Sequence, residues 1–395
     1  MKKILLSVLT LLGLTLSAMA TNPVITSMPS LSIAPDARAA GMGDLGVATA
    51  ADLNSQHWNP AKYTFMESKG GIIANYTPWL TKLVKDIDLA HIAGFYNMGD
   101  MAGTISGSFS YFSMGAVQLV DYTGTAFQEA HPNEWAVDLA YSRKLHEYLS
   151  MSVALRFLYS DLNNGVNSSV TESSTEMHPA WTMAADVALY YRQPIELPMG
   201  TSHFNLGFTL KNLGGKMNYA DDGSSNFIPA SMNIGVGYEL PCDKYNFLTF
   251  NVEANKLLVP SRNSKYTEGF DPNDETTWQM SQVEYSNLNS AKGWFQSFAD
   301  APGGVAEEFR EVRWGAGIEY SYNHQFFARA GYSYENYYKG NRNYVTFGAG
   351  FHLSIVTLDV SYCVGLAASN PLDQTMRFTL GFDLAGIEDL VNNKK

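Results

Sequence analysis

An alternation of apolar and polar side chains recurs along most of this chain. In TMRFTLGFDL (375–384), apolar residues stand at every even-numbered position, with threonine, arginine, glycine or aspartate between them. The same period of two residues returns in VRWGAGIEYSY (312–322), SMNIGVGYEL (231–240) and LSMSVALRFLY (149–159). A β-strand points successive side chains to opposite faces, so each segment predicts a strand with one apolar and one polar face.

Fourteen segments of about ten residues show this pattern. They span 70–77, 87–97, 101–113, 134–143, 149–160, 181–193, 203–213, 231–240, 246–255, 312–322, 325–335, 343–354, 355–364 and 374–384. An even number of strands is what single-chain bacterial outer-membrane barrels require. The pattern therefore predicts an all-β fold, a transmembrane antiparallel β-barrel of about 14 strands.

The lengths of the connections support a barrel over a soluble β-sandwich. Connections after even-numbered segments are short, whereas several after odd-numbered segments are long, namely 114–133, 161–180, 214–230 and 256–311. An antiparallel barrel returns to the same rim at every second connection, so the long loops all fall on one rim. Short periplasmic turns and long extracellular loops are expected of an outer-membrane barrel, and a sandwich gives no reason for this segregation.

The first twenty residues predict a secretory signal peptide, residues 1–20. Lys2 and Lys3 form a positive start, an apolar run covers 4–16, and Ala18-Met19-Ala20 matches a cleavage site. We expect the mature chain to begin near Thr21 and to lie beyond the inner membrane. After this segment no apolar run approaches the roughly 20 residues that a spanning helix needs.

Composition narrows the class further. The net charge is −12, and loss of two lysines with the signal peptide makes it more negative, which argues against nucleic-acid binding. The only cysteines are Cys242 and Cys363, so a disulfide-stapled secreted domain is excluded. We expect these two to be unpaired, because they fall at opposite ends of predicted strands. An exported, aromatic-rich chain without membrane helices is typical of an outer-membrane barrel.

The polar faces of the predicted strands carry charges of both signs. They are Asp138, Arg156, Asp186, Lys211, Glu239, Glu253, Arg313, Glu319, Arg329, Glu335, Asp359, Arg377 and Asp383. Charges removed from water usually pair. We expect a structural network inside the barrel rather than a transport or catalytic site.

Motifs for catalysis or cofactor binding are weak. Gly41, Gly43 and Gly46 spell GxGxxG, but SLSIAPDARAA precedes them instead of a buried strand, so a nucleotide site is not predicted. No histidine lies in HExxH, and GTSHF (200–204) is not a GxSxG elbow. DPNDETTWQMSQ (271–282) lacks the glycine and final glutamate of a calcium loop. We predict no enzyme activity, no cofactor and no metal.

The region before the first strand carries a family resemblance. ARAAGMGDLGVATAADLNSQHWNPA (37–61) closes with Asn59, Pro60 and Ala61. This arrangement resembles FadL-like outer-membrane proteins, and DARAAGMGDLGVATAAD (36–52) resembles more closely their PorV branch, the outer-membrane component of the type IX secretion system. The resemblance runs through the whole mature chain. One departure is that Phe382 is followed by DLAGIEDLVNNKK, so the chain does not end on an aromatic residue.

The resemblance implies a domain organisation. A hatch segment, 21–69, enters a barrel, 70–384, which carries a long extracellular loop, 256–311, and is followed by a short tail, 385–395. The glycines Gly41, Gly43 and Gly46 would then let the hatch turn tightly and pack against barrel side chains.

The resemblance also implies a function in the outer membrane of a Gram-negative bacterium, with the loops facing the cell exterior. Proteins like PorV associate with a very large translocon barrel and receive cargo through its C-terminal signal domain. They deliver that cargo to a surface attachment complex that contains a sortase. Two alternatives stay open: a FadL-like channel for hydrophobic small molecules, and an outer-membrane lipid-modifying enzyme.

The loop 256–311 is the predicted partner surface. It contains the large apolar side chains Phe270, Trp278, Leu288, Trp294, Phe295 and Phe298 among acidic residues. SNLNSAKGWFQSFADAPGG (286–304) predicts a short helix with Asn287 or Asn289 as N-cap, and 302–304 as its stop. Leu288, Trp294 or Phe295, and Phe298 would then form one apolar ridge that binds a partner. The alternative is that these side chains fold the loop down over the barrel mouth.

Overall fold

The structure is a computed structural model. It describes residues 24–82, 84–99, 101–120, 126–164, 177–221, 224–261, 282–301, 303–353, 355–366, 370 and 372–384. The predicted signal peptide (1–20), the predicted tail (385–395), Phe270 and Trp278 lie outside these residues, as does nearly all of the rejected calcium-loop stretch, 271–282. Within the described ranges, none of the helices combines the length and apolarity needed to cross a membrane.

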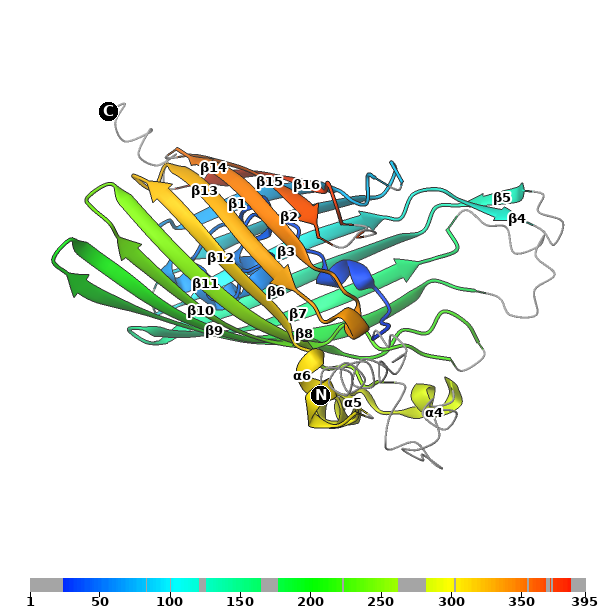
Figure 1. Cartoon of the computed structure of the whole chain (residues 1–395). Coiled ribbons are helices and arrows are strands. Elements are labelled where there is room, and N and C mark those ends of the chain that lie inside the picture. Colours follow the sequence, from blue (N-terminus) through cyan, green and yellow to red (C-terminus); the bar gives the residue numbers. More distant parts are fainter. Residues whose placement is uncertain are drawn as a thin grey trace, which may run out of the picture.

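Fourteen antiparallel strands close into a barrel (Figure 1). They are β1 (Gly70–Pro78), β2 (Asp88–Asn97), β3 (Thr104–Ser113), β6 (Asn133–His146), β7 (Leu149–Asp161), β8 (Ala180–Leu197), β9 (Gly200–Gly214), β10 (Ser231–Pro241), β11 (Asn246–Leu257), β12 (Arg313–Tyr322), β13 (Phe326–Tyr334), β14 (Tyr344–His352), β15 (Val356–Gly365) and β16 (Met376–Asp383). Each strand pairs with its predecessor in the barrel, and β16 pairs with β1 to close the ring. The predicted fold class and strand number are confirmed.

The two faces of each strand follow the alternation of the sequence. In β16, Phe378 and Phe382 are exposed on the outer face, whereas Arg377 and Thr379, on either side of Phe378, are buried. In β12, the outward Trp314 and Tyr320 are exposed, and Glu319 is buried. Apolar side chains thus cover the surface that meets lipid, and polar ones point into the lumen.

Two connections differ from the prediction. The nine-residue connection expected at 194–202 is a turn at 198–199, because β8 and β9 continue their pairing as far as Leu197 and Gly200. The predicted loop 114–133 contains a two-stranded hairpin, β4 (Val117–Val120) with β5 (Ala126–Ala130). The first difference arises because β8 and β9 extend their hydrogen-bond ladder beyond the alternating segment, and the second because the loop folds back on itself into a separate sheet.

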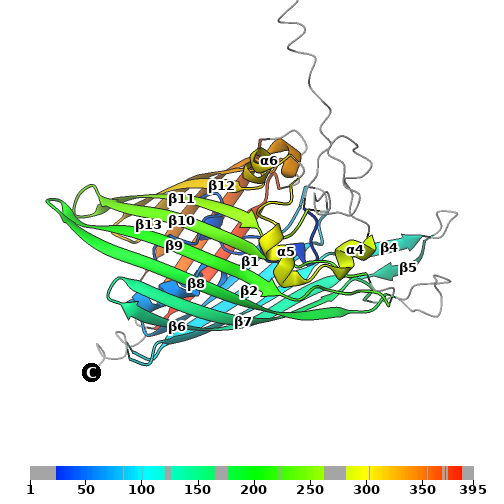
Figure 2. The same cartoon turned by 90° about the horizontal axis from the view of Figure 1, so that it is seen from below.

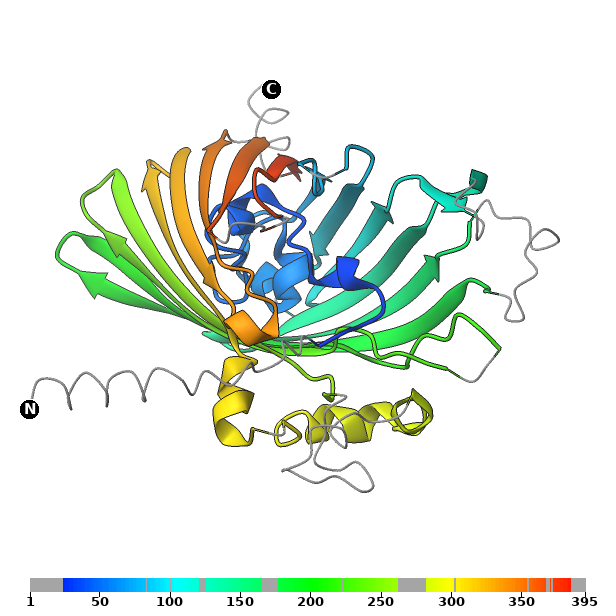
Figure 3. The same ribbon diagram turned by 45° about the vertical axis from the view of Figure 1, so that its right-hand side comes forward.

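Short helices occur before the first strand and in the long connections between strands. The N-terminal region has η1 (Pro29–Ser32), α2 (Ala37–Ala40), α3 (Ser55–Trp58) and η2 (Pro60–Phe65), and the long loops have α4 (Gln282–Asn287), α5 (Ser290–Gln296), α6 (Val305–Arg310) and η5 (Tyr337–Lys339). Helices α4 and α5 lie at the same end of the barrel as the β4–β5 hairpin (Figure 2). Residues 24–69, called here the lumenal segment, run inside the ring of strands (Figure 3).

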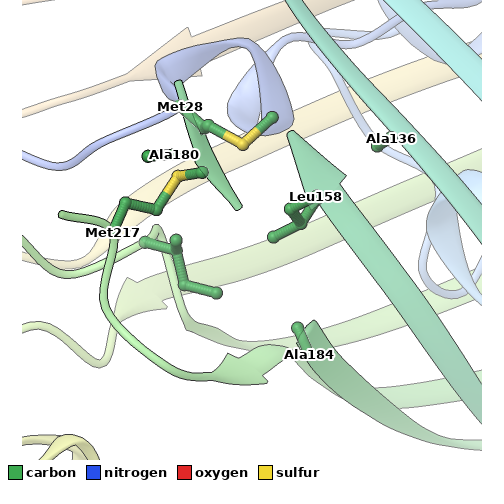
Figure 4. Close-up of a cluster of buried hydrophobic side chains, with 7 residues drawn as sticks. Met28, Ala136, Leu158, Ala180, Ala184 and Met217 are labelled. Carbon is green, nitrogen blue, oxygen red and sulfur yellow. The ribbon is translucent and has the colours of Figure 1, made fainter. Parts of the chain in front are cut away.

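The apolar core lies between the lumenal segment and the wall. One cluster joins Met28 of that segment to Leu158 of β7 and Met217 of the loop after β9 (Figure 4). Another joins Leu53 and Tyr63 to the inner face of β1 and β2, where the rings of Tyr63 and Phe95 stack with centroids 4.5 Å apart. A barrel wall has no second sheet to pack against, so this segment supplies the missing partner surface.

Candidate functional site in the lumen and outer loop

The three glycines of the GxGxxG pattern stand where the lumenal segment meets other atoms most closely. A Cβ on Gly41 would lie 3.0 Å from the Cα of Gly348 in β14. Gly43 has a positive φ of +84°, a conformation that favours glycine, and lies against the backbone of Tyr332. A Cβ on Gly46 would lie 2.1 Å from the indole of Trp58. These glycines permit close packing, and the pattern is therefore not a phosphate cradle.

Inward-facing glycines of the barrel wall leave room for the backbone of the lumenal segment. A Cβ on Gly331 of β13 would lie 2.0 Å from the carbonyl carbon of Met42, and one on Gly207 of β9 would lie 2.1 Å from the carbonyl oxygen of Val47. Backbone therefore packs directly on backbone over several strands. Sequence reasoning missed this fit, although inward-facing glycine pairs such as Gly315 and Gly317 were a readable signal.

Hydrogen bonds fix the same stretch to the wall. The amide of Gly43 donates to Thr346 Oγ1 at 2.9 Å. The amides of Gly46 and Val47 both donate to one carboxylate oxygen of Glu253, at 3.1 and 3.0 Å. Polar groups that face the lumen are thereby satisfied by the segment instead of by water.

Arg38 is the main charged link between the segment and the wall. Its guanidinium donates through Nε and Nη2 to the two carboxylate oxygens of Glu319, at 3.1 and 3.0 Å. It also donates to Asp52 at 2.9 Å. Glu319 accepts from Arg329 as well, and Arg329 reaches Asp359, both at 2.5 Å. The predicted mixed-charge network exists here, but the sequence analysis missed Arg38, its partner from the segment.

A second network surrounds Arg156 of β7. It forms ion pairs with Asp138 of β6 at 3.3 Å and with Asp186 of β8 at 2.9 Å. From the segment, Gln56 donates to Asp138. The segment is thus joined to charges on both sides of the ring, which supports a structural role for these lumenal charges.

The Asn59-Pro60-Ala61 motif is buried, and the Asn59 side chain caps the short helix η2 that begins at Pro60. Asn59 Oδ1 accepts from the amide of Ala61, so Asn59 caps η2, with Pro60 at its first position. Asn59 Nδ2 donates to the carbonyls of Val47 at 3.1 Å and Leu189 of β8 at 3.0 Å. One side chain therefore ties together two parts of the segment and the wall.

Two cavities lie at opposite rims, and the lumenal segment lines both. The cavity at the long-loop rim has a volume of about 250 Å³ and is lined by Ile33, Trp79, Arg313 and Tyr344 among others. The cavity at the short-turn rim has a volume of about 280 Å³, and its lining includes Asp52, Glu239, Glu319, His324 and His352. The second lining mixes apolar residues with several ionisable ones, and these charges do not suit a purely hydrophobic ligand.

The outer loop differs from the predicted single helix. Asn289 is the N-cap of α5, since its side chain accepts from the amide of Ala291 at 2.9 Å. Leu288 therefore precedes the helix and packs toward Phe227, Val259 and Tyr285. The helix also ends at Gln296, well before the predicted stop at 302–304, because the chain turns through Ser297 toward buried Asp300. The expectation of one ridge that includes Leu288 is wrong.

Two of the predicted partner residues are open to the surroundings. Phe295 is 77% exposed and Phe298 is 44% exposed, whereas Trp294 is half-buried. Phe270 and Trp278 lie outside the described residues. The described part of the predicted surface is therefore centred on Phe295 and Phe298.

Polar anchors hold this loop in place. Asp300 accepts from the amide of Ser261 at 2.8 Å, and burial, together with the nearby charges of Glu311 and Glu308, raises the pKa of Asp300 to about 7. Lys216 donates to the carbonyl of Tyr285 at 2.7 Å, and burial lowers the pKa of Lys216 to about 8. Asp300 and Lys216 therefore hold the loop in position and do not act on a substrate.

Comparison with models of known protein families shows which family the chain belongs to. A family model described as the type IX secretion system protein PorV matches residues 17–264, well over half of the chain. This chain belongs to the PorV family. The predicted membership is confirmed, and the chain is an outer-membrane barrel protein of the type IX secretion system. A comparison with curated proteins found no match.

Several solved structures resemble the PorV-family chain in fold. The toluene transporter TodX from Pseudomonas putida is 11% identical, with a TM-score of 0.49 and coverage of 92% of this chain and 98% of that one. A FadL homologue from Pseudomonas aeruginosa is 10% identical, with a TM-score of 0.40 and coverage of 92% and 100%. At these identities the likeness concerns the fold alone.

Both cysteines are free. Cys242 is exposed in the turn after β10, and Cys363 is buried near the end of β15. The prediction that they do not pair is confirmed.

Proposed function

We propose that this barrel is a non-enzymatic adaptor of the type IX secretion system. Its loop rim faces the cell exterior, where it binds the translocon barrel and the C-terminal signal domain of cargo. It then delivers the cargo to the sortase-containing attachment complex. The observation that carries the proposal is the exposed pair Phe295 and Phe298 on an anchored outer loop.

Large aromatic side chains that stay exposed on a fixed loop are typical interface anchors. Lys216, Asn289 and Asp300 all stabilise the backbone around Phe295 and Phe298. A pre-ordered loop loses less conformational entropy when a partner binds than a mobile one would. The loop therefore suits repeated binding and release of large partners.

The occupied lumen favours an adaptor over a channel for hydrophobic molecules. Between the two cavities, the lumenal segment packs on the wall through glycines and through Arg38. The short-turn cavity carries ionisable groups, with Asp52 and Glu319 among its lining residues. A hydrophobic substrate would need an apolar path past these groups.

The test is capture of partners by a Phe295→Ala/Phe298→Ala double variant. Each aromatic contributes on the order of 2 kcal/mol in a buried interface, so the double change should weaken binding about a thousandfold. The measurement is pull-down of the translocon from solubilised outer membranes, and of purified cargo signal domains, at matched levels of folded barrel.

A matched control changes exposed apolar residues of two other long loops. Val117 and Met177 are 45% and 46% exposed, and a Val117→Ala/Met177→Ala double variant should capture both partners normally. Loss of only one partner by the phenylalanine variant would assign the surface to that partner. Full capture of both by that variant would contradict the proposed role of this loop.

A further inference from the structure

Helix α6 turns its charged face toward the barrel and its apolar face away from it. Its sequence, VAEEFR, places Glu307 and Glu308 on one side. Val305 and Phe309, one turn apart, are 73% and 69% exposed. A helix on a water-soluble surface has the opposite arrangement, with the apolar side packed inward.

Two buried lysines hold the acidic side against the rim. Lys256 Nζ contacts Glu308 at 2.9 Å and Glu311 at 2.7 Å. Lys339 Nζ contacts Glu307 at 2.6 Å and Glu311 at 3.1 Å. Both lysine side chains are more than nine-tenths buried, so the orientation of α6 is fixed by paired charges with several contacts each.

Lys256 and the path of the chain place α6 at the rim near β11 and β12. In β11, the exposed residues Phe250 and Val252 face lipid, and Lys256 has the same parity. Lys256 stands two residues beyond Ala254, which pairs with the exposed Trp314 of β12. Figure 3 shows α6 outside the ring of strands, at the end of β12. The helix therefore lies at the rim, outside the ring and next to the start of β12 with its exposed Trp314.

Only a short link separates α6 from the wall strand β12. The chain passes from α6 into β12 through Glu311 and Val312 alone, so Phe309 lies close in sequence to Trp314. On the other side of α6, Arg310 lies 5.9 Å from the ring of Tyr338, and neighbouring Tyr337 is 62% exposed. Tryptophan and tyrosine at the end of a barrel strand mark the membrane–water interface.

We propose that α6 is an interfacial membrane helix, whose Val305 and Phe309 side chains enter the outer leaflet of the lipid bilayer. The surrounding medium is then apolar on the side where the helix is apolar, and the four ion pairs lie on the side shielded from it. Such helices lie about 5–10 Å into the boundary between headgroups and acyl chains. This contact fixes the height of the outer loop, and with it Phe295 and Phe298, relative to the membrane surface.

The test measures whether lipid surrounds Phe309. In a Cys242→Ser background, a Phe309→Cys variant is labelled with a nitroxide, while Cys363 stays protected because it is 1% exposed. The barrel is placed in nanodiscs of phosphatidylcholine and phosphatidylglycerol without partners. Collision rates with oxygen and with a water-soluble nickel chelate then report the depth of the label. Val305→Cys is the second site, and heat-modifiable gel mobility verifies that each variant is folded.

Two reference positions bracket the result. Phe250→Cys reports the lipid-facing wall, and Lys292→Cys reports the exposed side of α5. We expect labels at 305 and 309 to collide with the nickel chelate at least several-fold less than the label at 292, and to approach the value at 250. Equal nickel access at 292 and 309 would overturn the proposal. Protection of 309 only after addition of the translocon would also overturn it, because the apolar face would then bind protein.

Discussion

Arg38 and Glu319 form a two-point ion pair inside the barrel, although 281 residues separate them in the sequence. Arg38 belongs to the lumenal segment, and Glu319 to the half of β12 nearer the short turns. Because Glu319 also accepts from Arg329, the pair is one part of a chain of alternating charges that ends at Asp359. The segment is therefore fastened to a preformed charged site and does not rely on apolar packing alone.

Replacing Arg38 by glutamine should loosen the segment and leave the wall intact. The change leaves Asp52 with a hydrogen bond from Ser55 and a more distant lysine, Lys62, at 3.9 Å, whereas Glu319 keeps Arg329. Breaking a buried pair costs about 3–5 kcal/mol. We expect more frequent open-channel events in planar bilayers, with the folded barrel still resistant to SDS at room temperature.

The control for Arg38 is Lys82→Gln. Lys82 pairs with Asp373 at 2.7 Å, but it is half-exposed at the rim, so its loss should change stability by less than about 1 kcal/mol. Equal conductance in the Arg38→Gln, Lys82→Gln and wild-type proteins would mean that Arg38 does not hold the segment in the lumen.

Adding a side chain at Gly331 should displace the segment by steric exclusion alone. A Cβ there would lie 2.0 Å from a backbone atom of Met42, and neither backbone can move without breaking the β13 ladder or the turn at Gly43. We expect Gly331→Val to increase protease cleavage within 37–61 from the periplasmic side. Gly94→Ala is the control, because its closest contact is 3.2 Å and lies away from the segment. Cleavage at the wild-type rate in Gly331→Val would show that the wall accommodates the change.

The strands and their faces were predictable because a barrel wall imposes a rule on every residue. Lipid on one side and a polar lumen on the other require a period of two, and β12 follows it from Trp314 to Tyr322. Strand ends were less predictable. In β8, the residues from Gln193 to Leu197 pair with β9 without clear alternation, because this part projects beyond the lipid and is under no such constraint.

The partners of the lumenal charges were not predictable from the pattern. The alternation along the strands predicts that Glu319 and Arg329 face the lumen. Arg38 lies in a segment without such alternation, so no pattern relates it to these two residues. The outer loop was hard to predict for a different reason. From the sequence alone, Leu288 and Phe295 are both apolar residues that could be buried or exposed. The capping side chain of Asn289 decides which one faces the barrel and which one is exposed.

Replacing Asn59 by alanine should release three contacts at once. The side chain donates to Val47 and Leu189 and accepts from Ala61. The variant removes the donor to the buried Val47 carbonyl and to Leu189, at about 1–3 kcal/mol, and removes a helix cap worth about 1 kcal/mol. We expect a lower thermal midpoint for release of the segment in detergent, measured by protease access. Asn289→Ala, which removes a cap in the outer loop, should leave that midpoint unchanged. No shift with Asn59→Ala would contradict the role assigned to this motif.

The attachment of the outer loop should depend on pH through Asp300. Its pKa of about 7 in the folded protein lies above the ordinary value of 3.8, because burial and the charges of Glu311 and Glu308 disfavour the carboxylate. The folded loop therefore binds a proton more tightly than the detached loop, and its attachment weakens as pH rises from about 4 to about 7. Protection of the Ser261 amide against hydrogen exchange, corrected for intrinsic rates, should fall by up to about tenfold per pH unit within this window. Asp300→Asn keeps an acceptor for that amide without the charge, so its protection should be independent of pH and higher than wild type at pH 8.

Asp373 is the control: a hydrogen bond from Lys82 lowers its pKa, and it accepts from the amide of Gly365, so protection of Gly365 should not fall as pH rises. A Ser261 amide equally protected at pH 5 and pH 8 in the wild-type protein would show that Asp300 does not control the loop.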